Sequence, residues 1–282
     1  MKKVKIGIVA PASRMPQDIA DRVSAFVASE FPQAELHFHP QCFGEAGHFA
    51  GSDGARAAAF LDIANDASFD ALWVARGGYG SGRIADAVLS RLSRPALAKT
   101  YLGYSDAGFL LAGLYKRGFT VAHGPVAYDI RREGGASAVR RALDFLIHRK
   151  SETLEPTILR GEPLAAFNLM ILSQMIGTPL QPDLSGHILM LEEVSEYLYA
   201  IDRALFHITS NPDIRKVSGL MLGRCSDIPG NDPPFGQTEE EIARHWCSVA
   251  GIRYLGRADI GHDANNKIVP FGRWPWNRGP DF

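Results

Sequence analysis

The stretch that joins a predicted strand to a predicted helix reads TYLGYSDAGFLLAGLYK at residues 100–116. A β-type run ends at Gly103, and apolar residues then recur at helical spacing from Phe109 to Leu114. Ser105 lies at the turn between the two, as in a nucleophile elbow, where the hydroxyl is exposed and N–H groups of the helix start can bind an oxyanion. A serine at a turn is also a common helix N-cap, so a catalytic role needs a base and an acid from elsewhere in the chain.

Further pairs of strand and helix patterns surround this stretch in the first half of the chain. The expected strands are residues 4–9, 35–39, 71–75 and 100–103, and the expected helices are residues 19–31, 56–65, 84–92 and 107–116. This alternation predicts an α/β fold whose N-terminal domain is a doubly wound, mostly parallel sheet. Ligands of such sheets bind beyond the carboxyl ends of the strands, where Ser105 falls.

A polar, charged region at residues 131–161 separates this half from a second series of elements. Residues 151–156 resemble a linker, so we expect a first domain at residues 1–150 and a smaller C-terminal α/β domain at residues 160–282. The second part contains expected helices at residues 168–176, 197–208 and 239–250, expected strands at 187–191 and 219–223, and a tail rich in Gly, Pro and Trp.

The composition is that of a globular protein with a substantial core. The chain has 282 residues, 46% of them hydrophobic and 22% charged, and its formal net charge of -1 gives no electrostatic footprint for nucleic acid or an anionic membrane. The three cysteines form no C-x-x-C pair, and the apolar run at the N-terminus is too short for a signal peptide. We therefore expect a cytoplasmic protein that acts on a small polar substrate.

A glycine-rich loop follows the expected strand at residues 71–75. It reads RGGYGSGR at residues 76–83, and its backbone can approach a ligand without hindrance from Cβ atoms. It lacks the Gly-Lys-Ser/Thr end of a P-loop and the spacing of the dinucleotide fingerprint. A tight turn would explain two of its glycines more easily than four.

Candidates for the acid and the base occur in the second part. Glu192 directly follows an apolar strand, and Glu193 and Glu196 compete with it for the role of a cleft carboxylate. His262 lies in a glycine-flanked loop, and His123 follows a short expected strand and could line the site. Glu241 and His245 share a helix face, but no ligand cluster accompanies them, so we expect neither a metal nor a cofactor.

Several short motifs, and their order along the chain, resemble those of the LD-carboxypeptidases. This serine peptidase family includes muramoyltetrapeptide carboxypeptidase and the microcin C immunity peptidases. The resemblance covers nearly the whole chain, although Ala166 and Phe167 stand where family members often carry two glycines. The motifs that carry it are IGIVAP at residues 6–11, RGGYG at 76–80, LGYSD at 102–106, HGPV at 123–126, LEE at 191–193 with Glu196 and Tyr199, IDR at 201–203, GH at 261–262 and PFG at 270–272.

The resemblance implies that Ser105 is the nucleophile, His262 the general base and Glu192 the carboxylate that orients the imidazole. In the family the serine comes from the N-terminal domain and the other two residues from the C-terminal domain, so the active site would lie between the domains. The family's habit also suggests a homodimer. By analogy with other elbows, the backbone N–H groups of Gly78 and Asp106 would bind the oxyanion.

A carboxypeptidase must also recognise a terminal carboxylate, for which Arg76 and Arg203 are candidates. An ion pair of Arg203 with Glu196 or Asp202 is an equally good interpretation of that residue. Tyr79 is a further candidate for contact with the substrate.

The function that the resemblance implies is removal of the terminal D-Ala from the murein tetrapeptide during cell-wall recycling. An alternative is a microcin C immunity-type peptidase that cleaves peptidyl- or aminoacyl-nucleotide amides, in which Tyr79 or a tryptophan of the tail would stack on the base. An alternative of another class is a module that binds an anionic ligand at the glycine loop and the helix start without turnover.

Overall fold

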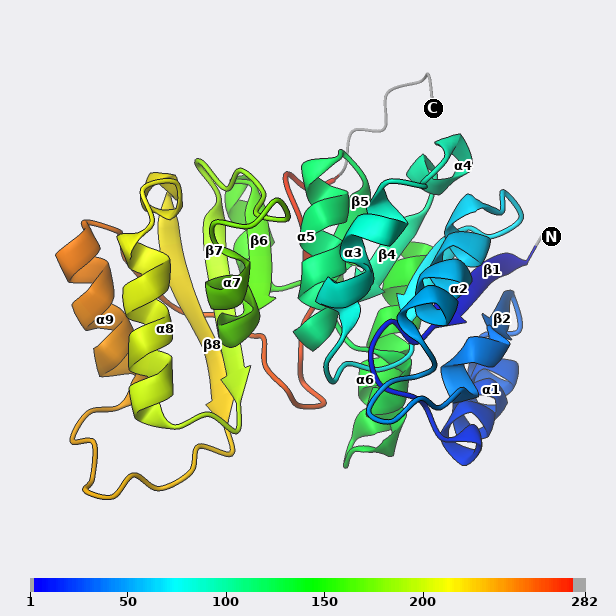
Figure 1. The fold of residues 1–282 in the computed structure, drawn as a ribbon, viewed down its shortest axis with the longest axis horizontal. Helices are drawn as coiled ribbons and strands as arrows, with labels where there is room; N and C mark the ends of the chain where they lie inside the picture. The colour runs from blue at the N-terminus through cyan, green and yellow to red at the C-terminus, as the bar shows by residue number, and fades with distance from the viewer. Residues whose placement is uncertain (1–2, 276–282) are drawn as a thin grey trace.

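The computed structural model describes residues 3–275, and its first sheet contains six strands in the order β10-β5-β4-β3-β1-β2 (Figure 1). All neighbours in this sheet are parallel except β10, which runs antiparallel to β5. Its strands are β1 (Val4–Val9), β2 (Ala34–Phe38), β3 (Ala71–Val74), β4 (Thr100–Gly103), β5 (Thr120–His123) and β10 (Val269–Pro270).

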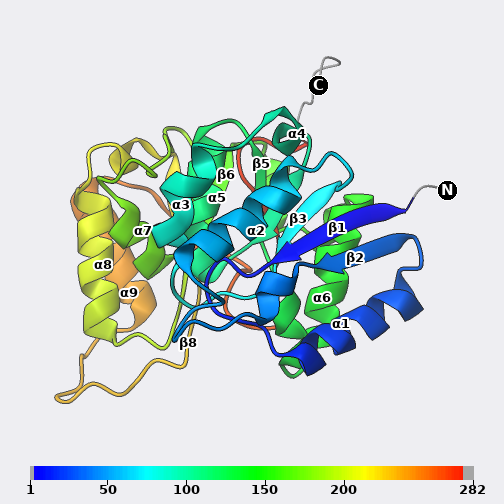
Figure 2. The same ribbon diagram turned by 45° about the vertical axis from the view of Figure 1, so that its right-hand side comes forward.

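Alternate residues of the central strands pack into different helix layers. Leu72 and Val74 of β3 join the core beneath α2, α3 and α5, whereas Trp73 joins the core beneath α1 and α6 (Figure 2). A strand buried on both faces reads as a continuous apolar run, which is why residues 71–75 are so hydrophobic. The helices are α1 (Gln17–Glu30), α2 (Asp53–Asn65), α3 (Ser81–Leu89), the short α4 (Arg94–Leu97), α5 (Gly108–Lys116) and α6 (Gly135–Leu143).

A second, smaller sheet has the order β6-β7-β8-β9, with all strands parallel. The two-part α/β architecture predicted from the sequence is confirmed, although the sequence pattern did not predict the short strands β6 and β9. The elements of this part are β6 (Leu164–Asn168), α7 (Leu169–Met175), β7 (Ile188–Val194), α8 (Leu198–Ser210), β8 (Gly219–Ser226), α9 (Glu239–Ala250) and β9 (Tyr254–Arg257).

Residues 151–156, predicted as a linker, are partly buried and hydrogen-bonded to the tail of the chain. Glu155 is buried, its N–H donates to the carbonyl of Ile268 (3.0 Å), and the N–H of Ile268 donates to the carbonyl of Thr153 (3.0 Å). Beyond Ile268 the tail adds β10 to the first sheet, and Gly272 then exchanges backbone hydrogen bonds with Leu164 of the second sheet. The tail therefore connects the two sheets, and its pairing with residues 153–155 could not be read from composition.

Within the first sheet the strand order reverses between β1 and β3, and the loops that follow these strands meet there. Binding sites of doubly wound sheets form at such a reversal. Gly78 has a φ of +116°, and a Cβ at this position would lie 2.1 Å from Oγ of Ser13. The glycine loop is thus packed tightly against the loop after β1. Among the helices of residues 3–275, none has the length and hydropathy that a bilayer-spanning segment needs.

The contact between β1 and α2 gives a test of this packing. A Cβ on Gly7 would lie 2.2 Å from Cγ2 of the buried Ile63, so we expect Gly7→Ala to lower the free energy of unfolding by about 1–3 kcal/mol. Urea unfolding followed by circular dichroism measures this. Gly54→Ala, in α2, is the control. Its new Cβ would meet only Oγ of Ser52, at 3.9 Å, so this substitution should be neutral or stabilising. Equal stability of Gly7→Ala and the wild type would contradict the packing.

Candidate active site

Ser105 occupies a left-handed turn at the carboxyl end of β4. Its φ is +59°, and the 3₁₀ turn Ser105–Ala107 leads directly into α5. A non-glycine residue in this region is strained, and such strain is typical of functional turns. A Cβ placed on Gly77 would lie 3.1 Å from Oγ of Ser105, so the glycine loop lies directly beside the hydroxyl.

The side chain of Asp106 fixes the glycine loop against this turn. It is 1% exposed, and its two oxygens accept hydrogen bonds from the N–H groups of Gly80 (3.1 Å) and Ser81 (2.8 Å), the start of α3. Burial raises the pKa of Asp106, and these hydrogen bonds oppose that rise. The carboxylate thus caps a helix that has no side-chain cap of its own. The sequence analysis missed this role, because the partners lie 25 and 26 residues from Asp106 in the chain.

The two N–H groups expected to bind an oxyanion remain available. Within residues 3–275, neither Gly78 N–H nor Asp106 N–H donates a hydrogen bond to another group of the chain. A Cβ on Gly77 would lie 4.0 Å from the nitrogen of Asp106 and 3.1 Å from Oγ of Ser105, so this N–H and the hydroxyl border the same space.

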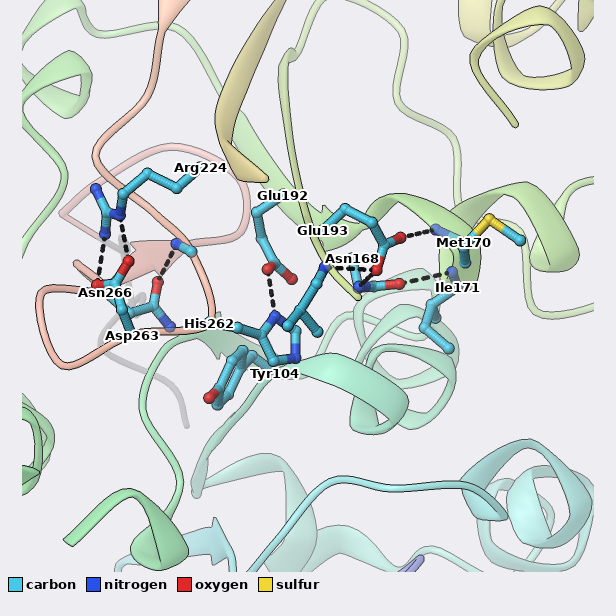
Figure 3. Close-up of polar contacts among 12 residues, drawn as sticks. Tyr104, Asn168, Met170, Ile171, Glu192, Glu193, Arg224, His262, Asp263 and Asn266 are labelled. Carbon is cyan, nitrogen blue, oxygen red and sulfur yellow. Dashed lines mark hydrogen bonds and ion pairs between the residues drawn. The ribbon is translucent and has the colours of Figure 1, made fainter. Parts of the chain in front are cut away.

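Glu192 and His262 form a buried pair on the side of the second sheet (Figure 3). Oε2 of Glu192 is hydrogen-bonded to Nδ1 of His262, and the two side chains are almost completely buried. This contact assigns the Nδ1–H tautomer and leaves Nε2 as the free nitrogen. Glu192 lies inside β7 rather than directly after the strand as predicted, because pairing with β8 continues past an irregularity between Leu191 and Glu193.

The loop that carries His262 is held on both sides by Arg224 of β8. The guanidinium of Arg224 pairs with Asp259 (2.6 Å) before the histidine and with Asp263 after it. Oδ1 of Asn266 accepts a hydrogen bond from the N–H of Gly261 (3.2 Å). These contacts hold the loop so that the imidazole lies opposite Glu192 (Figure 3).

Tyr104, the residue before Ser105, brings the two parts of the site together. Its ring centroid lies 4.8 Å from that of His262. Its hydroxyl donates to Asp129 (3.0 Å) and accepts from Arg132 (3.3 Å). Oγ of Ser105 has no hydrogen-bond partner within the described residues, so the hydroxyl makes no direct hydrogen bond to the imidazole. Such bonds are often long in the absence of substrate.

The charges around His262 decide its protonation. Burial alone would lower the pKa of His262, but the charge and hydrogen bond of Glu192, helped by the charge of Glu193, outweigh it and raise the pKa above its ordinary value. The positive charge of Arg132 acts in the opposite direction. His123 lies behind Tyr104, with ring centroids 5.6 Å apart, and burial lowers its pKa to about 3, so it stays neutral.

The structure separates the competing carboxylates. Glu193 accepts hydrogen bonds from Asn168 Nδ2 (2.7 Å) and from the N–H groups of Met170 (2.9 Å) and Val194 (2.8 Å), so it anchors the start of α7 (Figure 3). Burial raises its pKa to about 7. Glu192 alone of the three predicted candidates pairs with an imidazole; Glu196 lies in the turn before α8.

The expected substrate residues lie in different places. Arg76 donates to the carbonyl of Arg14 (3.0 Å) and lies over the ring of Tyr128, close to the elbow. Tyr79 is 55% exposed beside Phe49. Arg203 lies over Tyr199 on the exposed face of α8, and the ion pair considered for it does not form.

Asp202, a candidate partner of Arg203, instead accepts a hydrogen bond from Nε1 of Trp246 (2.9 Å). Trp274 packs on Phe145, and Trp276 lies outside the described residues. In the described part of the chain, no group of three His, Cys, Asp or Glu side chains could hold a metal ion.

A cavity of about 800 Å³ lies between α3, α5 and α7, apart from the ionisable pair. Tyr79 and Asp106 contribute to its wall, but Glu192 and His262 do not. We place the site at the elbow and the Glu192–His262 pair, because a carboxylate hydrogen-bonded to an imidazole can move protons and neither residue lines the cavity.

The pairing of His262 with Glu192 can be tested without any substrate. In Glu192→Gln the negative charge is lost while burial remains, so we expect the pKa of His262 to fall from above to below its ordinary value. Titration of the imidazole by NMR measures the shift in both proteins. Glu240→Gln, on the exposed surface of α9, is the control that should leave His262 unchanged. An unaltered titration in Glu192→Gln would refute the pairing.

Comparison with known proteins matches both halves of the chain to one family. The LD-carboxypeptidase N-terminal domain matches residues 6–124, and the LD-carboxypeptidase C-terminal domain matches residues 163–274. A relative from Synechocystis is 31% identical over 84% of this chain and 79% of its own length. The murein tetrapeptide carboxypeptidase of Pseudomonas aeruginosa is 23% identical over 95% of this chain and 91% of its own.

Solved structures show the same fold. Muramoyltetrapeptide carboxypeptidase from Oxalobacter formigenes superimposes with a TM-score of 0.78 at 22% identity, covering 94% of this chain and 93% of its own. The microcin C7 self-immunity protein MccF, in complex with aspartyl sulfamoyl adenosine, also gives 0.78, at 18% identity and with 96% and 92% of the two chains covered. The two domain matches together span most of the sequence, and they show that the chain is a member of the LD-carboxypeptidase family of serine peptidases.

Proposed function

We propose that this protein is a serine carboxypeptidase that releases the terminal D-Ala from the murein tetrapeptide L-Ala-γ-D-Glu-meso-diaminopimelate-D-Ala. The observation that carries the proposal is the buried Glu192–His262 pair beside the strained turn of Ser105. The relatives named as murein tetrapeptide and muramoyltetrapeptide carboxypeptidases support the choice of substrate. A cytoplasmic location and a homodimer remain predictions.

In the proposed mechanism the hydroxyl of Ser105 attacks the carbonyl carbon of the peptide bond that joins diaminopimelate to D-Ala. Nε2 of His262 takes the hydroxyl proton, and Glu192 stabilises the imidazolium through Nδ1. The N–H groups of Gly78 and Asp106 bind the oxyanion of the tetrahedral intermediate. The imidazolium then gives its proton to the leaving nitrogen, the C–N bond breaks, and D-Ala departs.

An acyl-enzyme on Ser105 remains and is hydrolysed by the same groups. A water molecule gives one proton to Nε2 of His262 while its oxygen attacks the ester carbonyl. Collapse of the second intermediate returns the proton to Oγ of Ser105 and releases the tripeptide. Because the pKa of His262 is raised, its imidazole becomes protonated, and so unable to act as a base, at a higher pH than an ordinary histidine would.

The nucleophile gives the first test. Ser105→Ala should reduce D-Ala release from the tetrapeptide by about 10⁴-fold or more, because the acyl-enzyme cannot form. Release is measured by coupling to D-amino acid oxidase, and His262→Ala should show a comparable loss. Turnover retained in Ser105→Ala would overturn the covalent mechanism. If the wild type cleaves an aminoacyl-nucleotide amide but not the tetrapeptide, the substrate assignment is wrong and the immunity-type alternative replaces it.

The space beside the hydroxyl gives a second test. Gly77→Ala places a methyl group 3.1 Å from Oγ of Ser105, so we expect kcat/KM to fall by about 10²-fold through displacement of the nucleophile. Thermal unfolding should change little, because the φ of Gly77 lies outside the left-handed region. Gly230→Ala is the matched control, since its Cβ would meet no atom within 4 Å. Full activity in Gly77→Ala would contradict the placement of the loop.

A further inference from the structure

Three arginines gather beside the elbow, around the turn Ala127–Arg131 that follows β5. The guanidinium carbon of Arg76 lies 4.3 Å from the ring centroid of Tyr128, and that of Arg131 lies 5.2 Å from it. Arg131 also donates to the hydroxyl of Tyr128 (2.9 Å). Arg132, the next residue, contacts the hydroxyl of Tyr104 (3.3 Å).

The backbone places this group next to Ser105. The N–H of Tyr128 donates to the carbonyl of Ala75 (2.8 Å), so the turn is fixed to the end of β3 just before Arg76 and Gly77. Gly77 borders the hydroxyl of Ser105, and Tyr104, the partner of Arg132, directly precedes that serine. Arg76 and Arg132 are therefore each linked to the elbow through a residue that borders or precedes Ser105.

Of the three arginines, Arg76 and Arg131 have no carboxylate partner in the described part of the chain, whereas Arg132 has one. The buried Asp129 is committed to Arg132, to the hydroxyl of Tyr104 and to the N–H of Val126. Within residues 3–275, no carboxylate lies within ion-pair distance of Arg76 or Arg131, and the exposed Glu133 pairs with neither. The nearby Arg14 is already paired with Glu45 (2.8 Å).

Arginines held on an aromatic ring lose little entropy when they bind a planar anion. We propose that Arg76 and Arg131, ordered by Tyr128, form the subsite that binds the free terminal carboxylate of the peptide substrate. The inference rests on the proposed carboxypeptidase activity and adds Arg131 and Tyr128 to it. Arg203, on the exposed face of α8, takes no part in this subsite.

Binding to an inactive protein tests the subsite. In a Ser105→Ala background, calorimetry compares the tetrapeptide free acid with its C-terminal amide. We expect the acid to bind about 10- to 100-fold more tightly, as for a hydrogen-bonded charge pair. Adding Arg131→Ala or Arg76→Ala should reduce this ratio to a few-fold, and Arg131→Lys should restore part of it, because lysine keeps the charge but loses the planar fork.

The control is Arg244→Ala in the same background. Arg244 also lies over a tyrosine ring, that of Tyr254 (4.5 Å), but on α9, and its loss should leave the ratio unchanged. A ratio near one in the parent, or an unchanged ratio in both Arg76→Ala and Arg131→Ala, overturns the subsite while the peptidase assignment stands. If neither peptide binds the parent protein, the proposed substrate class fails and the subsite fails with it.

Discussion

The site depends first on the burial of one carboxylate. An ionised group removed from water must find hydrogen-bond donors inside the protein, and Asp106 finds them in the N–H groups of Gly80 and Ser81. Arg56 of α2, also fully buried, donates to the carbonyl of Gly80 (2.8 Å). Both backbone polar groups of Gly80 are thus held by buried charged side chains, which fixes the glycine loop against the turn at Ser105. Hydrogen-bond donors that are fixed in advance need no reorganisation when an anion forms beside them.

The second half of the site reaches the first through a continuous series of contacts. Glu193, next to Glu192 in β7, holds the start of α7. A Cβ on Gly108, the first residue of α5, would lie 3.0 Å from Cγ2 of Ile171 in α7, so the two helices are in close contact. Because α5 begins directly after the turn at Ser105, packing of α7 on α5 sets the spacing between the two halves of the site. A shift of one helix would therefore move His262 away from the turn at Ser105.

The sequence predicted the central strands well, because strands buried on both faces leave long apolar runs. It also predicted Glu192 and His262 as partners, although only through the family resemblance. It could not predict the cap that Asp106 provides or the clamp of Arg224 on its two aspartates, since both depend on pairs of residues far apart in the chain. The short strand β9 is half-exposed, which removes the hydrophobic signal. Arg132 lies in a run of charged residues, a pattern that predicts solvent-exposed surface. Its contact with Tyr104 can be seen only in the structure.

The return of the tail to the first sheet has a topological consequence. β10 covers the edge of β5, yet it comes from the end of the chain, after all the strands of the second sheet. A gene divided between the two sheets would leave this strand with the wrong half and expose the backbone of β5, and an open edge of that kind pairs readily with other chains. The two halves of this protein are therefore poor candidates for fission into separate genes.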